Sequence, residues 1–384
     1  MEAVDLKTVV ERMHALGLRQ WLLEELTESF EVARKGKRHT YDEHSFDVNW
    51  GYNIITLCDS ILERRYEVSP SIVFVIFDPM VREIFAATFR DRIVHHFLYR
   101  MQGGWWDRHF INDSYSCRVG KGTLYAQKRV QQMMRKVSVN CTGPAGVMKM
   151  DIKGYFMSLP RLKLCEKVRW GIERQFACVE KDPMGRQLKQ ICEYLWEKVL
   201  MDDPTVNARR RGEWWHWNDD VLPASKSLFA QPPGYGLPIG NVTSQLASNI
   251  YMDEFDRFVR YDLGYKYYGR YVDDFVIVDT DKKRMIADVP KMEEFLRTRL
   301  QLTLHPKKRY IQDVRKGVNF VGAEIYPKHI HPGRRLMSKF PAALEKLLAG
   351  EGDIDTVESY VGLMRHVDAE RYIAKVIDRL NVGE

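Results

Sequence analysis

Apolar residues recur at helical spacing along much of this chain and alternate with polar ones in a few short runs. The helical pattern is clearest over 4–34 and 50–64. Further helices are expected at 91–102, 162–173, 184–200, 244–260 and 283–300, and over about the last 50 residues. The strand patterns lie at 72–77, 147–152, 265–271, 275–279 and 318–326. This order, with helices at both ends of a mixed middle, predicts an α+β fold.

One long segment, 202–233, follows neither pattern and is rich in tryptophan. Irregular segments of this length in compact domains are usually functional or disordered. Trp214, Trp215 and Trp217 argue against disorder. These rings either stack on nucleic-acid bases or pack against the body of the protein, and packing is the more frequent use.

Composition narrows the classes of protein that remain. A chain of 384 residues suits two or three packed domains, and 45% hydrophobic residues exclude a disordered chain. No apolar run approaches the roughly 18 residues of a membrane span. The N-terminus lacks the order of a signal peptide, and the six cysteines form no metal-binding pattern, so we expect reduced thiols and a cytoplasmic protein.

Positive charge is in moderate excess and gathers at two places. The net charge of +7 permits a polyanionic partner such as nucleic acid without requiring one. The basic residues at 34–39 form either a solvated loop or a phosphate contact. Those at 34–38 and at 208–211 are candidates to bind nucleic-acid phosphates.

Three carboxylates carry the main chemical signal. Asp273 and Asp274 are adjacent between two strand patterns, where a tight turn would normally carry glycine. Asp151 ends an apolar strand, where a lone acid needs a partner. Adjacent acids repel each other unless a cation lies between them and another ligand. Three carboxylates on neighbouring strand ends suffice for two Mg²⁺ ions, which can activate a 3′-hydroxyl and stabilise leaving pyrophosphate.

These residues lie within motifs that resemble those of reverse transcriptases. Tyr271-Val272-Asp273-Asp274 resembles their YxDD box, and MDIKGYFMSLPR, from Met150, resembles their first palm motif. GLPIGNVTSQLASNIYMDEFD, from Gly236, and VREIFAATFRDRIVHHFL, from Val81, resemble the loop-helix and fingers motifs. Motifs around 304–308 and 319–322 resemble the last palm motif and the primer grip. The resemblance covers roughly residues 20–370 and implies a right-hand polymerase with fingers, palm and a short helical thumb.

The implied domains are 1–145 for the N-terminal helices and fingers, 146–330 for the palm with fingers insertions, and 331–384 for the helical thumb. Pro238-Ile239-Gly240 followed by Ser244-Gln245 is similar to the reverse transcriptases of diversity-generating retroelements. That subfamily implies cDNA synthesis from a retroelement template RNA with errors at adenine, and an accessory variability protein as an oligomeric partner. A phage-defence reverse transcriptase is the alternative, and a catalytically idle RNA-binding scaffold is a third reading, which the intact acids oppose.

The resemblance also implies roles for single residues. The catalytic metal ligands would be Asp151, the carbonyl of Ile152, Asp273 and Asp274. Phe156 matches the ring that excludes a ribose 2′-hydroxyl, with Tyr155 as its rival. The remaining candidates bind the incoming nucleotide, the template pair or pyrophosphate: Arg82, Ile239, Gly240, Gln245 and Lys308, with Lys307 as an equally placed rival of Lys308.

Overall fold

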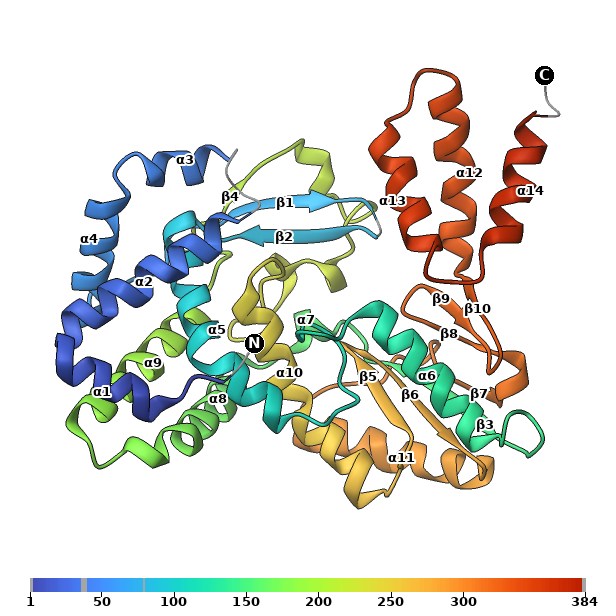
Figure 1. The fold of residues 1–384 in the computed structure, drawn as a ribbon, viewed down its shortest axis with the longest axis horizontal. Helices are drawn as coiled ribbons and strands as arrows, with labels where there is room; N and C mark the ends of the chain where they lie inside the picture. The colour runs from blue at the N-terminus through green and yellow to red at the C-terminus, as the bar shows by residue number, and fades with distance from the viewer. Residues whose placement is uncertain (1–2, 36–39, 79, 382–384) are drawn as a thin grey trace. The chain divides into compact units, whose positions relative to one another are not determined.

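The computed structural model describes residues 3–35, 40–78 and 80–381. The described chain is a mixture of helices and short strands (Figure 1). It divides into two compact units, each built from separate stretches of sequence. The first unit contains Met1–Ile111, Gly154–Glu254 and Leu300–Leu302, and the second contains Asn112–Lys153, Phe255–Arg299 and Thr303–Glu384.

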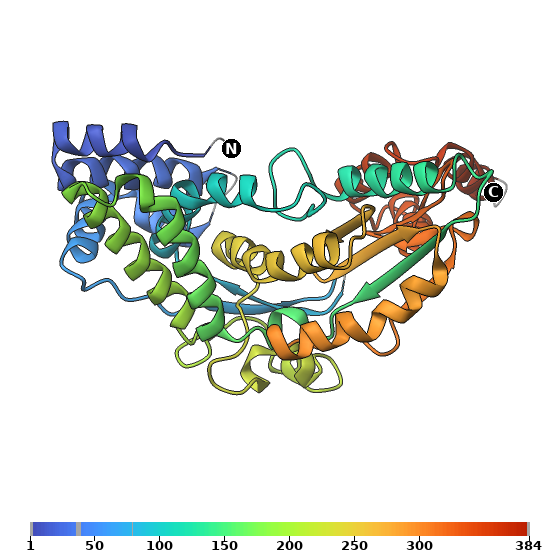
Figure 2. The same cartoon turned by 90° about the horizontal axis from the view of Figure 1, so that it is seen from below.

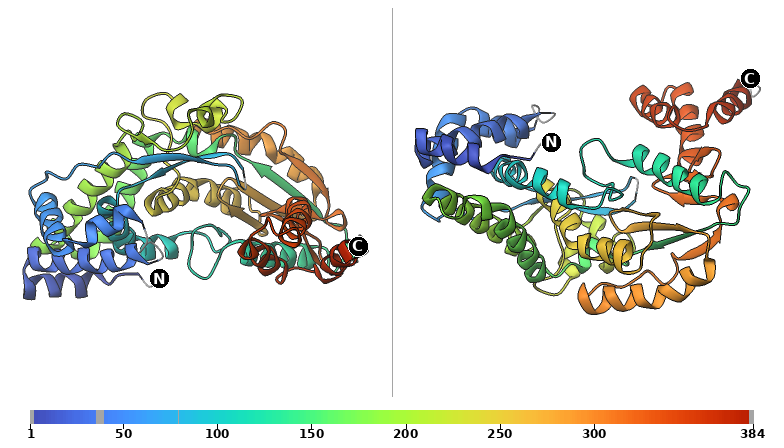
Figure 3. Two further views of the ribbon diagram at one scale, coloured as in Figure 1. Left: turned by 90° about the horizontal axis from the view of Figure 1, so that it is seen from above. Right: turned by 60° about the horizontal axis from the view of Figure 1, so that its bottom comes forward.

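Helices make up most of the first unit. They are α1 (Leu6–Leu16), α2 (Leu18–Arg34), α3 (Tyr41–Asp47), α4 (Trp50–Leu62), α5 (Phe89–His109), α7 (Tyr155–Ser158), α8 (Arg161–Phe176), α9 (Pro183–Met201) and most of α10 (Val242–Arg257). The continuous pattern over 4–34 is two helices rather than one, because Gly17 takes a positive φ of 80° and caps α1. Asp182 caps α9 with Pro183 in its first turn, and α8 and α9 pack side by side (Figure 3).

A small sheet completes the first unit. β1 (Ile72–Ile76) pairs antiparallel with β2 (Arg82–Ala86) and parallel with β4 (Arg209–Arg210). One face of this sheet packs on an apolar cluster: Val73, Phe85, Met157 and Leu228, with Ile239 and Trp217 against it. The irregular segment 202–233 therefore supplies an edge strand and part of a core, as well as short 3-10 turns.

The second unit is built on a four-stranded antiparallel sheet. Its strands are β3 (Gly146–Asp151), β5 (Tyr268–Tyr271), β6 (Asp274–Asp279) and β7 (Tyr310–Asp313), in the order β5-β6-β3-β7. Helices α6 (Thr123–Val137) and α11 (Lys282–Arg299) lie on opposite sides of it (Figure 2). Val147 faces the buried side chains of α6, whereas Met148 and Met150 face α11. The alternation of β3 thus fixes which side chains share a face with Asp151.

A second sheet and three helices follow in the same unit. β8 (Val318–Phe320), β9 (Ala323–Ile325) and β10 (Ile330–Pro332) form a meander. The single strand expected at 318–326 is wrong: Val321 and Gly322, with φ of 49° and 78°, turn the chain between β8 and β9. Helices α12 (Arg334–Leu348), α13 (Ile354–Met364) and α14 (Glu370–Asn381) share their own apolar cluster around Phe340 and Met364 (Figure 1).

The expected elements are mostly present, with shifted ends. The strand expected to start at 265 begins at Tyr268, and the helix expected at 91–102 is the longer α5. Seven further helices and strands in the described ranges were not expected from the pattern: α3, β2, β4, α6, α7, β7 and β10. None of the helices in the described ranges is both long and apolar enough to span a membrane. The expected domain limits at 145 and 330 remain predictions.

Candidate active site

The β5–β6 hairpin and the end of β3 bring the three predicted carboxylates together within the second unit. Asp151 lies directly opposite Asp274 in the antiparallel register, so their side chains share one face of the sheet. The backbone N–H of Ile152 donates to the carbonyl oxygen of Asp273 at 3.2 Å. The hairpin turn is therefore tied to the strand end that carries Asp151.

The turn itself adopts a conformation that its residue type disfavours. Tyr271 pairs with Asp274, which leaves a two-residue loop of Val272 and Asp273. Val272 has a φ of 57°, a left-handed value that hairpins usually assign to glycine. Such a conformation costs a β-branched residue about 1–3 kcal/mol and persists only where the surroundings impose it.

Two lysines balance part of the negative charge. Lys308 Nζ donates to Asp151 Oδ2 at 3.0 Å, and Lys149 Nζ lies 3.2 Å from Asp274 Oδ1. The rival Lys307 contributes its backbone N–H, which donates to His305 Nδ1 at 3.2 Å. The structure thus places Lys308, rather than Lys307, against the acids.

Burial and repulsion perturb the acids strongly. Burial, followed by the fields of Asp274 and Asp151, raises the pKa of Asp273 to about 6. Burial also raises the pKa of Asp274, against the opposing effect of Lys149. For Lys308, burial lowers the pKa, but the hydrogen bond to Asp151 and the neighbouring carboxylates outweigh it and raise the pKa overall. The site therefore holds excess negative charge that the protein only partly compensates.

The donor set suits a divalent cation, although the side chains are not arranged around one. Within the described ranges, no three His, Cys, Asp or Glu side chains stand close enough together to hold a metal ion. The oxygen donors are nevertheless those that Mg²⁺ prefers, and a bound cation would relieve the repulsion that raises the pKa of Asp273. Asp151, Asp273, Asp274 and the carbonyl of Ile152 are the residues that could hold it.

A buried ion pair lies behind the hairpin. Arg270, in β5, is fully buried and donates from Nε and Nη2 to the two carboxylate oxygens of Asp256, both at 2.7 Å. Tyr268 donates its hydroxyl to the same carboxylate at 2.6 Å. The remaining guanidinium nitrogen, Nη1, donates to the carbonyl of Val272 at 2.8 Å. The strained turn is thus connected to a charge pair in the core.

Five of the predicted nucleotide and template residues belong to the first unit: Arg82, Phe156, Ile239, Gly240 and Gln245. The N–H of Leu237 donates to the carbonyl of Phe156, and the N–H of Phe85, in β2, donates to the carbonyl of Ile239. Gly240 follows with a φ of 132°, and a Cβ there would lie 2.8 Å from the carbonyl oxygen of Phe85. The loop 236–240 is therefore fastened to both α7 and β2.

The rivals Phe156 and Tyr155 occupy different environments. Tyr155 is buried and donates its hydroxyl to the carbonyl of Ser248 at 2.6 Å, which makes it a packing residue. Phe156 is only partly buried. Arg82 and Gln245 are exposed, Arg82 on β2 and Gln245 near the start of α10. Their exposure leaves both side chains accessible to a ligand.

The other predicted contacts have mixed outcomes. Arg34 forms ion pairs with Glu31, Glu43 and Asp47, whereas residues 36–39 of the same basic cluster lie outside the described residues. Trp214 is 77% exposed, whereas Trp217 is covered by the guanidinium of Arg210 at 5.5 Å. Packing therefore accounts for Trp217 but not for Trp214.

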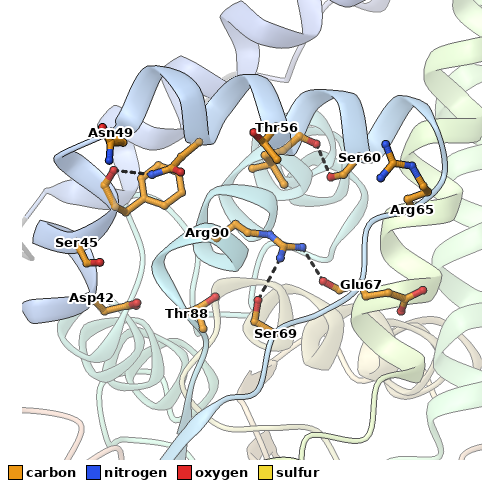
Figure 4. A pocket seen from close by; sticks show the side chains of 13 residues that line it. Asp42, Ser45, Asn49, Thr56, Ser60, Arg65, Glu67, Ser69, Thr88 and Arg90 are labelled. Atoms are coloured by element: carbon orange, nitrogen blue, oxygen red, sulfur yellow. Dashed lines mark hydrogen bonds between the residues drawn. The ribbon is translucent and has the colours of Figure 1, made fainter.

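A polar cavity of about 530 Å³ in the first unit contains none of the predicted site residues (Figure 4). Arg90 crosses it and donates to Ser69 Oγ and to the carbonyl of Glu67. Arg90 Nε also lies 3.7 Å from the Asp91 carboxylate. The cavity is lined by α3, α4, the chain around 65–69 and the start of α5, so it belongs to the helical packing rather than to the carboxylate site.

Sequence reasoning missed several residues that support the site. Lys149 lies two residues before Asp151 in β3, and residues at this spacing share a face of the sheet. The spacing could therefore have placed Lys149 on the face that carries Asp151. Arg270, Asp256 and Ser116, whose Oγ accepts the N–H of Val272, carry no sequence pattern that would link them. Only the folded chain reveals their association.

One family model matches part of the chain. Residues 198–325 match the model described as reverse transcriptase (RNA-dependent DNA polymerase). The match includes Asp273, Asp274 and Lys308, whereas Asp151 and Arg82 lie outside it. No curated protein sequence matches the chain.

Solved telomerase structures share similarity with this one. Apo telomerase from Candida tropicalis has a TM-score of 0.42 and 12% identity, over 77% of this chain and 56% of that chain. Telomerase from Candida albicans in complex with a TWJ fragment of telomeric RNA has a TM-score of 0.43 and 12% identity, over 82% and 57%. The chain spans a little over half the length of these telomerase chains.

The family match confirms the predicted polymerase fold and enzyme class. Residues 198–325 match an RNA-directed DNA polymerase (nucleotidyltransferase) domain, and the described chain has the α+β fold expected for a right-hand polymerase. Domains of this family generally use divalent metal ions.

Proposed function

We propose that the protein copies a retroelement template RNA into cDNA, extending a primer with dNTPs at a site where Asp151, Asp273, Asp274 and the carbonyl of Ile152 hold two Mg²⁺ ions. One observation carries the proposal. Asp151 and Asp274 lie opposite each other on adjacent strands, Asp273 lies in the turn beside them, and the pKa of Asp273 is unusually high; both Asp273 and Asp274 fall within the matched family region. A binding scaffold gains nothing from such acids, because they would repel RNA phosphates.

The bound ions would lower the pKa of the primer 3′-hydroxyl and stabilise charge on the leaving pyrophosphate. We assign separate tasks to the other predicted residues. Lys308, already beside Asp151, supplies a positive charge toward the pyrophosphate. Phe156 excludes a 2′-hydroxyl by its volume, and the exposed Arg82 binds the triphosphate through its planar guanidinium.

Primer extension on an RNA template tests this polymerase activity. Asp151→Asn and Asp273→Asn should abolish DNA synthesis while RNA binding persists, because each removes a negatively charged metal ligand. Asp279→Asn is the matched control, since Asp279 ends the same strand, β6, at the opposite end from the hairpin. Either site variant extending a primer at near the wild-type rate would refute the assignment.

The mutagenic retroelement role rests on the loop 238–240 and on the motif resemblance. Ile239 packs its apolar side chain against the cluster that contains Phe85, so it offers no hydrogen bond to a template base or its surroundings. The base pair between the template and the incoming nucleotide would be held there mainly by packing, with Gln245 and Arg82 at its edges. Such a pair tolerates mispairing at template adenine. An oligomeric accessory variability protein would be the partner of such an enzyme.

Deep sequencing of cDNA copied from one adenine-containing RNA tests the retroelement role. Ile239→Asn and Arg82→Ala should each change the error frequency at adenine more than at the other three bases. An equal loss of synthesis at all four bases would indicate general catalysis instead. No adenine bias in the wild-type cDNA would reject the mutagenic role and favour the phage-defence alternative.

A further inference from the structure

Val272 in the catalytic hairpin is held by hydrogen bonds at both of its backbone polar groups. Its carbonyl accepts from Arg270 Nη1 at 2.8 Å, and its N–H donates to Ser116 Oγ at 3.2 Å. Both peptide groups of one strained residue are therefore fixed. From this geometry we infer that Ser116 and Arg270 form a clamp that holds the left-handed Val272 and thereby positions the Asp273 carboxylate.

The clamp is anchored outside the hairpin. The segment 113–116 runs beside β5, with the N–H of Arg270 donating to the carbonyl of Asp113 and the N–H of Tyr115 donating to the carbonyl of Arg270. Ser114 Oγ accepts from Arg270 Nη2 at 3.3 Å. Ser116 thus reaches Val272 from a segment whose register along β5 is already fixed.

The core side of the clamp is rigid as well. Arg270 and Asp256 are both fully buried, and the two bonds between them fix the plane of the guanidinium. Only Nη1 is directed at the carbonyl of Val272. Because two hydrogen bonds to Asp256 hold the buried guanidinium in place, it cannot move with Val272. A change in the turn would therefore break the hydrogen bond from Nη1 to the carbonyl of Val272.

The position of Val272 matters because Asp273 is the next residue. The carbonyl of Asp273 accepts from the N–H of Ile152, directly after Asp151, so a relaxed turn would shift two metal-binding carboxylates relative to each other. Without the two hydrogen bonds to Ser116 and Arg270, a valine at this position would adopt a negative φ. Ser116 and Arg270 are therefore positioning residues: they act on the acids through Val272.

Substitutions at Ser116 and Val272 form a cycle that tests the clamp. Ser116→Ala removes the hydroxyl that accepts the N–H of Val272. It should lower kcat about fivefold, and it should lower the affinity of the free protein for Mn²⁺ about fivefold as well. The KM for dNTP should stay within about twofold, since the substrate contacts remain. Ser116→Thr keeps the hydroxyl and should restore both quantities. In a Val272→Gly background, where the turn needs no clamp, Ser116→Ala should change each quantity by less than about twofold.

Ser138→Ala is a closely matched control. Ser138 is also buried, and its hydroxyl also accepts a backbone N–H, that of Cys141, in a turn where Val139 has a positive φ. That turn lies between α6 and β3, away from the hairpin. Ser138→Ala should lower the urea midpoint as Ser116→Ala does, while kcat and the Mn²⁺ affinity stay unchanged.

Any of three results would overturn the inference. The first is a Ser116→Ala protein with wild-type kcat and wild-type Mn²⁺ affinity, and the second is an equal effect of Ser116→Ala and Ser138→Ala on kcat and on Mn²⁺ affinity. The third is an equal effect of Ser116→Ala in the wild-type and Val272→Gly backgrounds. If Ser116→Ala does not fold, the comparison of Ser116→Thr with Val272→Gly decides, since both should keep Mn²⁺ affinity. The inference rests on the proposed function only for the measurements of kcat and KM, not for the Mn²⁺ affinity. A wild-type protein that makes no DNA would refute that function, whereas the Mn²⁺ comparison would still test the clamp.

Discussion

Replacing Asp273 by asparagine should stabilise the metal-free protein while abolishing its chemistry. In the folded state, burial and the fields of Asp274 and Asp151 raise the pKa of Asp273 from its usual 3.8 to about 6. Below pH 3.8 both the folded and the unfolded chains hold this proton, so the group has no net effect there. Between pH 3.8 and about 6, the unfolded chain has released the proton while the folded chain still holds it, so stability falls as pH rises and levels off above about 6. The neutral amide of asparagine avoids this cost.

The size of the effect follows from the shift. A change from 3.8 to about 6 corresponds to about 3 kcal/mol, at roughly 1.4 kcal/mol per pKa unit. The side chain is only partly buried by its accessible surface, so water screens part of the field, and we expect about 2 kcal/mol. That is a large share of the roughly 5–15 kcal/mol typical of a folded domain.

Urea unfolding with EDTA at pH 8 and at pH 4 measures this difference. Asp273→Asn should exceed the wild type by about 2 kcal/mol at pH 8 and by much less at pH 4. Asp279→Asn, at the far end of β6, controls for the substitution itself. Added Mg²⁺ should then stabilise the wild type, by about 2.7 kcal/mol at a hundredfold excess over Kd, and the variant less. Equal stability of the two proteins at pH 8, or equal gains from Mg²⁺, would refute the reasoning.

Three further predictions concern other parts of the chain. Phe156→Ala should raise ribonucleotide incorporation about tenfold in competition with dNTP; a rise in Tyr155→Ala instead would show that the wrong ring was named. His95 is buried, and this burial lowers its pKa from 6.5 to about 4, so only the unfolded state binds a proton between these pH values. The free energy of unfolding should therefore fall by up to about 3 kcal/mol as pH drops from 7 to 4. In urea unfolding, His95→Gln should show a weaker dependence of stability on pH over this range. Gly240→Ala should raise the KM for dNTP and destabilise the fold by about 1–3 kcal/mol, because its Cβ would meet the carbonyl oxygen of Phe85 at 2.8 Å; an unchanged KM and midpoint would mean that the backbone shifts freely.

Local patterns in the sequence predicted those parts of the fold whose structure is decided locally. The alternation around 147–152 gives β3, and the apolar period around 184–200 gives α9, with Asp182 and Pro183 marking its start. The pattern did not reveal β7, whose residues are exposed or half-buried and therefore show no clear alternation. It also merged β8 and β9, because the turn between them includes Val321, a residue type that rarely accepts a positive φ.

The acids of the site could be found from sequence because they contradict their surroundings. Asp151 ends an apolar strand, and Asp273 and Asp274 occupy a turn without glycine. The groups that make this arrangement tolerable leave no such trace. Arg270 and Asp256 look like ordinary charged residues in the sequence, and only tertiary packing brings them together with no exposed surface. A buried charge can be inferred from its isolation, but its partner depends on the fold.

The two lysines at the site differ in a way that bears on their tasks. Lys149 has a side chain only 16% exposed and lies on the same strand as Asp151, so it is a fixed charge beside Asp274. Lys308 is 57% exposed, and it can leave Asp151 at little cost because water can replace the contact. A cation bound at the acids would weaken the attraction between Lys308 and Asp151, and Lys149 would stay in place. In the proposed reaction, we therefore assign the contact with the leaving pyrophosphate to Lys308 rather than Lys149.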